Sequence, residues 1–125
     1  MILGIGIDLV SIERIRAALT RHGERFERRI LTAVELEQLA DRADRAQAVA
    51  GRFAVKEAAF KAMGGPDGVA WREIEVVREP SGAPRIQWRG AAVSAIAQMG
   101  NPRAFVSLTH DGGMAAAVVV LESVA

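Results

Sequence analysis

The sequence predicts an α+β domain in which a mostly antiparallel sheet packs against a long central helix. Helical and strand-like segments follow one another in the order βαααββαββ, and two pairs of strands are joined by turns short enough for hairpins. Residues 46–64 form a long alanine-rich helical segment with no proline and only Gly51 inside. At 125 residues, the chain has the length of a single domain, 1–125.

The first predicted element is a strand from Ile2 to Val10, because this continuous apolar run is typical of a strand buried on both sides. One face of the strand is aliphatic: Leu3, Ile5, Ile7 and Leu9. The opposite face is mixed: Ile2, Gly4, Gly6, Asp8 and Val10. Glycines beside an aspartate leave room for a large group to approach the backbone.

Helical segments follow this strand. Ser11 is suited to cap a first helix, which Gly23 interrupts before the helical pattern resumes. Thr32 to Arg42 is predicted as a short helix in which Thr32 and Glu35 form a capping box.

The long helix is predicted to start near Asp44 and to stop at the breaker Gly64-Gly65-Pro66. At about 100° per residue, one stripe of this helix collects mainly apolar residues: Ala46, Ala50, Phe53, Phe60 and Gly64. Glu57 lies within the stripe, on the face expected to meet the core, and Lys61 follows it at the favourable i,i+4 spacing. An ordinary ion pair at the edge of the core explains Glu57 and Lys61 as well as a functional site does.

The C-terminal half is predicted to hold the remaining strands. Glu73–Arg78 and Pro84–Trp88 form one hairpin, and a helix covers Ala91–Met99. Ala104–His110 and Met114–Leu121 form a second hairpin across the turn Asp-Gly-Gly.

Composition excludes several classes of protein. The net charge of +1 argues against a general nucleic-acid binder. The absence of cysteine excludes disulfides, thiol catalysis and zinc–thiolate sites, and it fits a reducing cytoplasm. No secretory leader is evident, and no apolar run approaches the roughly 20 residues of a membrane helix. We therefore expect a soluble, cytoplasmic protein that does not bind membranes.

Asp8 and Glu57 are the candidates for metal chemistry. A lone aspartate at a strand end is more often a cap or turn residue, but two carboxylates on core-facing positions favour a shared hard cation. Magnesium is bound by one or two carboxylates together with water and substrate phosphates. Arg52, Lys56 and Lys61 lie near Glu57 on the helix and suit a metal-bound diphosphate, although a solvated helix flank is an equal alternative for Arg52 and Lys56.

Other polar residues have weaker signals. His110 precedes a tight turn and is more often a structural turn residue than a base. Four arginines form a local basic cluster: Arg14, Arg21, Arg25 and Arg28. This cluster is either a solvated face or a docking surface for an acidic protein. GIGID lacks the third glycine of a dinucleotide-binding fingerprint.

Three segments resemble the holo-acyl-carrier-protein synthases, the small trimeric class of 4′-phosphopantetheinyl transferases: GIGIDLVSIERI, RFAVKEAAFKAMG and VSLTHDGGMAAAVVV. The resemblance extends from Ile2 to Glu122 and keeps the order and spacing of the family. It implies the 4′-phosphopantetheinyl transferase fold and a magnesium-dependent role in fatty acid biosynthesis. The implied reaction moves the 4′-phosphopantetheine arm of coenzyme A to a serine hydroxyl of an acyl carrier protein and releases adenosine 3′,5′-bisphosphate.

The resemblance also implies residue roles. Asp8 and Glu57 match the magnesium ligands, and Lys61 matches the lysine that contacts the diphosphate, so these three are the implied catalytic residues. His110 matches a histidine at the nucleotide-binding end of the site. Arg52 and Lys56 match positions that make phosphate or structural contacts. Arg14 matches the arginine that meets the acidic recognition helix of the carrier protein. Family members are trimers with each active site at a subunit boundary.

Two departures from the family pattern limit what carries over. The family's usual Gly-Thr-Gly is replaced by the loop from Gly64 to Gly68, so contacts in this loop are not transferred. Thr109 stands where a serine is common and keeps the hydroxyl.

Two other functions remain open from the residues alone. A magnesium-dependent hydrolase of nucleotide diphosphates would use the same acids. A binding module would instead dock an acidic partner on its arginine-rich face, with Glu57 and Lys61 serving a structural purpose.

Overall fold

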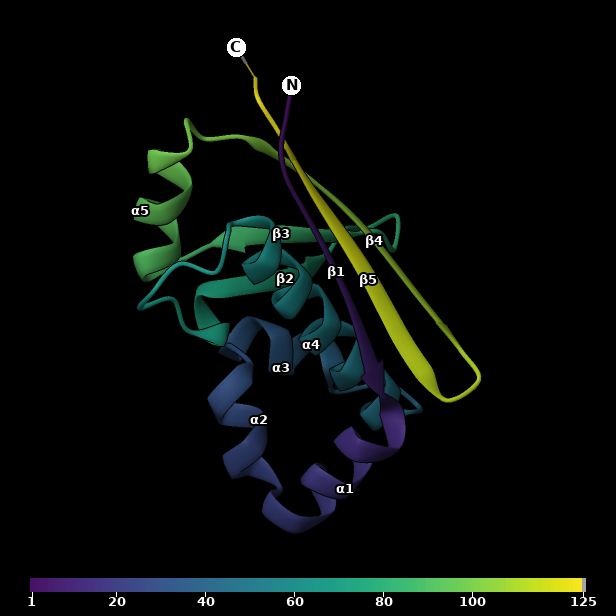
Figure 1. Ribbon diagram of the computed structural model, residues 1–125. Helices are drawn as coiled ribbons and strands as arrows, with labels where there is room; N and C mark the ends of the chain where they lie inside the picture. Colours follow the sequence, from purple (N-terminus) through teal and green to yellow (C-terminus); the bar gives the residue numbers. More distant parts are fainter. Residues whose placement is uncertain (125) are drawn as a thin grey trace.

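The computed structural model describes residues 1–124, and its elements follow the predicted order with two differences (Figure 1). The first predicted helix is divided into α1 and α2, and a short 3-10 helix, η1, is added. The strands are β1 (Ile2–Ser11), β2 (Ile74–Arg78), β3 (Pro84–Trp88), β4 (Arg103–Asp111) and β5 (Met114–Glu122). The helices are α1 (Ile12–His22), α2 (Glu24–Ile30), α3 (Ala33–Leu39), α4 (Arg45–Ala62), η1 (Trp71–Glu73) and α5 (Gly90–Gln98). Within residues 1–124, no helix is long and apolar enough to cross a membrane.

The predicted caps position the first helices. Ser11 accepts the backbone N–H of Arg14 at the start of α1. Thr32 and Glu35 form the predicted capping box at the start of α3. Gly23 has a positive φ of 53°, which a residue with a side chain rarely adopts, so α1 ends there and α2 begins.

The strands form two antiparallel sheets, which confirms the predicted pairing direction but divides the strands into two groups. One sheet has the order β1-β5-β4, and the other consists of β2 and β3. Asp8 pairs with Ala117 of β5, which in turn pairs with Leu108 of β4. The start of β1 and the end of β5, where Ile2 pairs with Glu122, lie together at one end of the larger sheet (Figure 1).

Helix α4 lies between these two sheets. It packs against β1 and β5 on one side and against β2 and α3 on another. A Cβ at Gly6 would lie 1.7 Å from the carbonyl oxygen of Ala58, and one at Gly4 would lie 1.9 Å from that of Ala62. The glycines of β1 therefore admit the backbone of α4, as the sequence predicts for a large group beside them.

The core-facing stripe predicted for α4 is only partly right: Ala46 and Ala50 are buried, but the rest of the stripe is not. Other fully buried positions lie beside the stripe and include Ala54, Val55 and Ala58. Phe53, Glu57 and Phe60 are only half-buried. Because α4 is covered on more than one side, apolar residues surround most of its circumference, and periodicity alone does not identify the core face.

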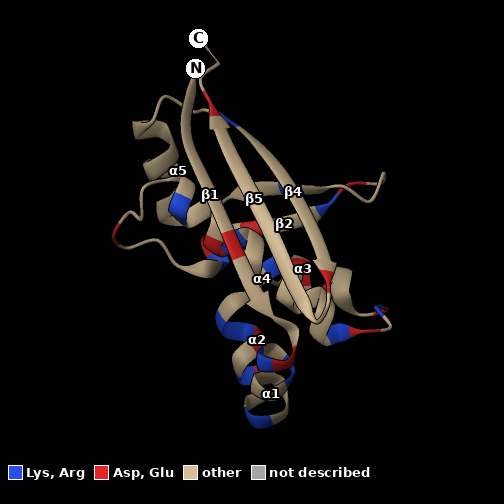
Figure 2. Cartoon of the chain, turned by 45° about the vertical axis from the view of Figure 1, so that its right-hand side comes forward, with Lys and Arg blue, Asp and Glu red and all other residues tan. Residues whose placement is uncertain are grey.

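The face of the larger sheet that points away from α4 is exposed and apolar. Its large side chains are Leu3, Ile5, Ile7 and Leu9 of β1 and Phe105 of β4, and the exposed fraction reaches 67% at Ile7. Figure 2 shows the three strands carrying few charged residues. The prediction that β1 is buried on both sides is therefore wrong for the single chain.

Candidate active site

Asp8 and Glu57 line the same cavity, although one belongs to β1 and the other to α4. This carboxylate cavity has a volume of about 270 Å³ and is also lined by Arg14 and Phe53. Asp8 follows Gly6 in the row of β1 that faces α4, and Glu57 immediately precedes Ala58, the residue whose backbone approaches Gly6. Close packing of strand on helix thus brings two distant carboxylates to one site.

Lys61 pairs with Asp8 and not with Glu57, so the expected i,i+4 ion pair is absent from the described residues. Its Nζ lies 3.1 Å from Asp8 Oδ1 and 2.9 Å from the carbonyl oxygen of Ile7. Strand β1 runs alongside α4, and it offers Lys61 a carboxylate and a backbone acceptor together. The Asp8 side chain is 16% exposed and that of Lys61 is 52% exposed, which leaves the ammonium accessible to solvent.

Glu57 is held by a residue that the sequence analysis missed. Trp71 Nε1 donates a hydrogen bond of 2.7 Å to Glu57 Oε1. The Trp71 ring lies 5.6 Å from that of Phe53, centroid to centroid, and the Arg29 guanidinium lies 5.9 Å from its centroid. A tryptophan just after a glycine-rich loop was the available signal, because the N–H of a buried indole usually has a partner.

A second cavity adjoins Glu57 on the side of Trp71. This aromatic cavity has a volume of about 420 Å³ and is lined mainly by apolar side chains, among them Phe60, Val69 and Trp71. Glu57 also lines it, so this carboxylate borders both cavities.

The Asp8 and Glu57 carboxylates fit a magnesium ion. Carboxylates are the hard oxygen ligands that Mg²⁺ takes from proteins, and one or two of them suffice when substrate phosphates and water complete the shell. Within residues 1–124, no group of three or more histidine, cysteine, aspartate or glutamate side chains is placed to hold a metal.

Lys56 has a structural role, which is one of the two roles implied for it, and its contacts contradict the alternatives of a phosphate contact and a solvated flank. Its side chain is fully buried, and Nζ donates to Glu35 Oε1 (2.8 Å) and to the carbonyl oxygens of Trp71 (3.0 Å) and Ile74 (2.7 Å). An ammonium has three N–H donors, and these acceptors use all of them. Burial lowers the pKa of Lys56, while the charge of Glu35 raises it in part.

Arg52 is also buried, with 5% of its surface exposed, which fits the structural contact among its implied roles and contradicts a solvated flank or a contact with a bound molecule. Its Nη2 donates to Gln38 Oε1 at 3.0 Å, and its Nε lies 4.0 Å from Glu35 Oε2. Burial lowers the pKa of Arg52 below its ordinary value. Sequence reasoning identified Glu35 as a capping residue but not as the partner of these cations, because the contacts join segments distant in the sequence.

His110 lies in a different cavity from Asp8 and Glu57. Its Nε2 is 3.1 Å from the side-chain nitrogen of Gln47, and the cavity of about 370 Å³ beside it is lined also by Arg16 and Asp44. The single chain therefore does not join the histidine to the carboxylates, and its expected role at the nucleotide stays a prediction.

The four arginines predicted to bind a partner are exposed on α1 and α2: Arg14, Arg21, Arg25 and Arg28. These two helices carry most of the basic residues at that end of the molecule (Figure 2). The break at Gly23 means that they do not share one continuous helix face. Arg28 pairs with Glu24 at 3.3 Å, whereas Arg14 lines the carboxylate cavity. Of the four, Arg14 is the one placed beside the candidate metal ligands.

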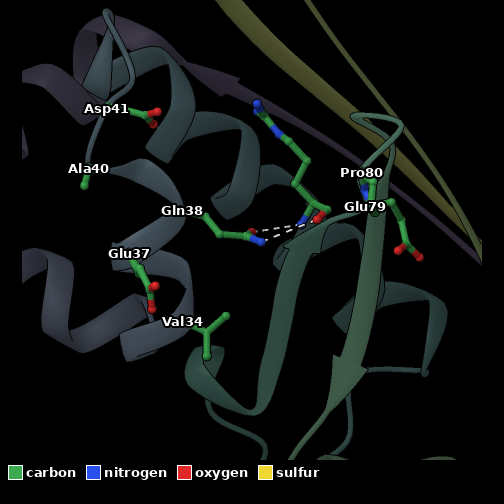
Figure 3. Close-up of a pocket in the computed structure, with 8 residues that line it drawn as sticks. Val34, Glu37, Gln38, Ala40, Asp41, Glu79 and Pro80 are labelled. Atoms are coloured by element: carbon green, nitrogen blue, oxygen red, sulfur yellow. Dashed lines mark hydrogen bonds between the residues drawn. The ribbon is translucent and has the colours of Figure 1, made fainter.

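A large cavity between α3 and β2 lies apart from these residues. It has a volume of about 760 Å³, and Figure 3 shows Val34, Gln38 and Glu79 among its lining residues. The Gln38 side chain both donates to the carbonyl oxygen and accepts from the N–H of Arg78, which ties α3 to β2. No predicted site residue lines this cavity, so it is not part of the candidate active site.

Comparisons with known proteins agree with the sequence motifs. A family model described as the 4′-phosphopantetheinyl transferase superfamily matches residues 4–117. A holo-[acyl-carrier-protein] synthase of Nitratidesulfovibrio vulgaris (strain DP4) is 48% identical, over 98% of this chain and 100% of that protein.

Solved structures of the same class have the same fold. The holo-[acyl-carrier-protein] synthase of Neisseria meningitidis superposes with a TM-score of 0.91 at 34% identity, covering 98% of this chain and 100% of that one. The ACPS-CoA complex of Chronobacterium ammoniagenes gives a TM-score of 0.85 at 30% identity, covering 96% of each chain. With matches of this extent in both sequence and structure, the chain belongs to the 4′-phosphopantetheinyl transferase superfamily and, within it, is an enzyme of the holo-acyl-carrier-protein synthase class.

Proposed function

We propose that this enzyme transfers the 4′-phosphopantetheine arm of coenzyme A to a serine hydroxyl of an acyl carrier protein in a magnesium-dependent reaction. The serine hydroxyl gives its proton to a water molecule or a carboxylate, and its oxygen bonds to the phosphorus that carries the pantetheine. The bond from that phosphorus to the bridging oxygen breaks, and adenosine 3′,5′-bisphosphate leaves. The observation that carries the proposal is the meeting of Asp8 and Glu57 at one cavity. The names of its relatives and the coenzyme A complex of a structural neighbour support the two substrates.

Asp8 and Glu57 would hold the magnesium ion. Bound there, the ion supplies positive charge to the diphosphate while negative charge develops on the leaving phosphate. Within residues 1–124, Glu57 Oε2 accepts no hydrogen bond, so this oxygen is open for a ligand contact. Asp8 Oδ1 already accepts from Lys61, which fixes the orientation of its carboxylate.

Lys61 would contact the diphosphate. Its ammonium uses two donors on Asp8 and on the backbone of Ile7, and a third donor is left for a phosphate oxygen. Because the side chain is half exposed, a substrate can reach it from solvent. Holding the diphosphate and the acceptor serine in one orientation supplies much of the acceleration in phosphoryl transfer.

Arg14 would orient the carrier protein. It is exposed at the mouth of the carboxylate cavity, and an acidic partner docked on it would bring its serine next to Asp8 and Glu57. The other arginines of α1 and α2 extend the positive surface and would act on the rate of encounter.

The enzyme is proposed to act as a homotrimer. The exposed aliphatic face of β1, with Ile5 at 63%, Ile7 at 67% and Leu9 at 64% exposure, is the surface that further copies would cover. Burying one such side chain contributes about 1.5–3 kcal/mol, so Ile7→Glu is expected to give monomers in sedimentation equilibrium. A wild-type chain that sediments as a monomer at micromolar concentration would contradict the trimer.

Mass spectrometry of an apo carrier protein tests the transfer itself. Incubation with the enzyme, coenzyme A and Mg²⁺ is expected to add one phosphopantetheine to the carrier serine and to yield adenosine 3′,5′-bisphosphate. Asp8→Asn and Glu57→Gln should abolish this gain, because both remove a charged ligand. Arg85→Gln should still modify the carrier, because Arg85 is exposed on β3 and lines neither cavity at Glu57. Consumption of coenzyme A without the carrier protein would instead indicate a hydrolase.

A further inference from the structure

We infer that Trp71 is a positioning residue for Glu57, which orients this carboxylate toward the divalent cation. The inference rests on the proposed function, since it gives Glu57 the task of binding that cation. Carboxylates that bind metals are commonly fixed by hydrogen bonds from a surrounding shell of residues, and loss of such a bond weakens metal binding.

Two successive residues of α4 fix the two ends of Trp71. The Lys56 ammonium donates to the Trp71 carbonyl oxygen at 3.0 Å, and the indole N–H donates to Glu57 Oε1 at 2.7 Å. Lys56 is fully buried and is itself anchored on Glu35 and on the carbonyl oxygen of Ile74. The backbone of η1 is thereby held on α4 at the point where the indole reaches Glu57.

The indole ring is also confined from its sides. Phe53 contacts it in a tilted arrangement, with the planes at 48°, and the Arg29 guanidinium lies over the ring at 5.9 Å from the centroid. Offset aromatic pairs and cations over an indole are both attractive. A ring held by Phe53 of α4 and Arg29 of α2 presents its N–H in one direction.

An indole suits this task because it donates a hydrogen bond without carrying a charge. Asp8 is paired with the ammonium of Lys61, which offsets part of its charge. Glu57 receives only the neutral N–H of Trp71 on Oε1, so its negative charge remains for a cation and Oε2 remains without a hydrogen bond within residues 1–124. The structure thus gives the two carboxylates different partners.

Cation binding to the substrate-free enzyme tests the inference. Mn²⁺ serves as the probe, measured by electron paramagnetic resonance, with Mg²⁺ competing for the same site. Trp71→Phe removes the donor, and benzothienylalanine at position 71 keeps the ring shape while a sulfur replaces the N–H. Trp88→Phe is the matched control, because Trp88 is a half-buried tryptophan of β3 that lines neither cavity at Glu57.

We expect both changes at position 71 to weaken Mn²⁺ binding roughly 10-fold or more, the usual loss for such a partner of a metal ligand, and Trp88→Phe to leave it unchanged. The benzothienylalanine enzyme should melt at the wild-type temperature, so its loss would not reflect unfolding. Wild-type affinity in that enzyme would overturn the inference and leave the proposed function intact. If Glu57→Gln binds Mn²⁺ as tightly as the wild type, the proposed metal site itself fails, and the inference falls with it.

Discussion

Replacement of Lys56 by methionine tests whether the buried cation at the centre of α4 holds the fold together. Removing one partner of a buried ion pair costs about 3–5 kcal/mol, because the remaining charge stays buried without compensation. Here Lys56→Met would leave the Glu35 carboxylate without its hydrogen-bonded cation, with only Arg52 Nε at 4.0 Å from Oε2, and the carbonyl oxygens of Trp71 and Ile74 without this donor. Each carbonyl oxygen that loses its hydrogen bond costs on the order of 1 kcal/mol, and the cost of breaking the ion pair already includes part of this. We therefore expect Lys56→Met to lower the free energy of unfolding by about 3–5 kcal/mol.

Denaturant unfolding at a fixed protein concentration measures this loss, since assembly would make the stability depend on concentration. Lys61→Met is the control, because Lys61 forms a half-exposed ion pair and should cost about 1 kcal/mol or less. The double variant with Glu35→Gln should lose less than the sum of its parts, as expected for residues in one network. A loss below about 1 kcal/mol for Lys56→Met, or strict additivity, would refute the role assigned to Lys56.

Three further predictions concern the helix–strand contact, a titrating cap and the metal. Gly6→Ala would place a Cβ 1.7 Å from the Ala58 carbonyl oxygen, so we expect about 1–3 kcal/mol of destabilisation or more in denaturant unfolding. Two backbone N–H groups, at the starts of η1 and α5, donate to the Glu73 carboxylate and lower its pKa. The carboxylate therefore stabilises the fold fully above its unfolded pKa of about 4.3, and this stabilisation is lost as the pH falls through the folded pKa. The melting-temperature difference between wild type and Glu73→Gln should therefore shrink on acidification, and a constant difference would contradict this. Mg²⁺ at 100 times its dissociation constant should stabilise the wild type by about 2.7 kcal/mol but not Asp8→Ala, and an equal thermal shift in both would argue against the site.

The helices and strands could be predicted well from the sequence, because the signals that start and end them lie close together in the chain. The capping box of Thr32 and Glu35, the break at Gly23 and both hairpin turns each depend on residues within a few positions of one another. The motif resemblance supplied the family and the pairing of Asp8 with Glu57, which composition and periodicity only suggested.

The faces of α4 could not be predicted in the same way. Lys56 and Glu57 are adjacent in the sequence, but the Lys56 ammonium is buried among oxygen atoms, whereas the Glu57 carboxylate borders two cavities. Their fates are decided by Glu35 and Trp71, which approach from segments before and after the helix. A charged residue inside an alanine-rich helix shows its role only when its distant partners are known.

The alanine content of α4 and the glycines of β1 bear on the chemistry as well as on the packing. The distance between a strand and a helix depends on the side chains between them, and Gly6 lies directly against the backbone of Ala58. Asp8 and Glu57 are each within two residues of this contact, so the spacing of the carboxylates follows from it. A larger residue at Gly6 would push β1 from α4 and separate the two acids even if neither were changed. The small residues of both elements therefore set the geometry of the proposed metal site.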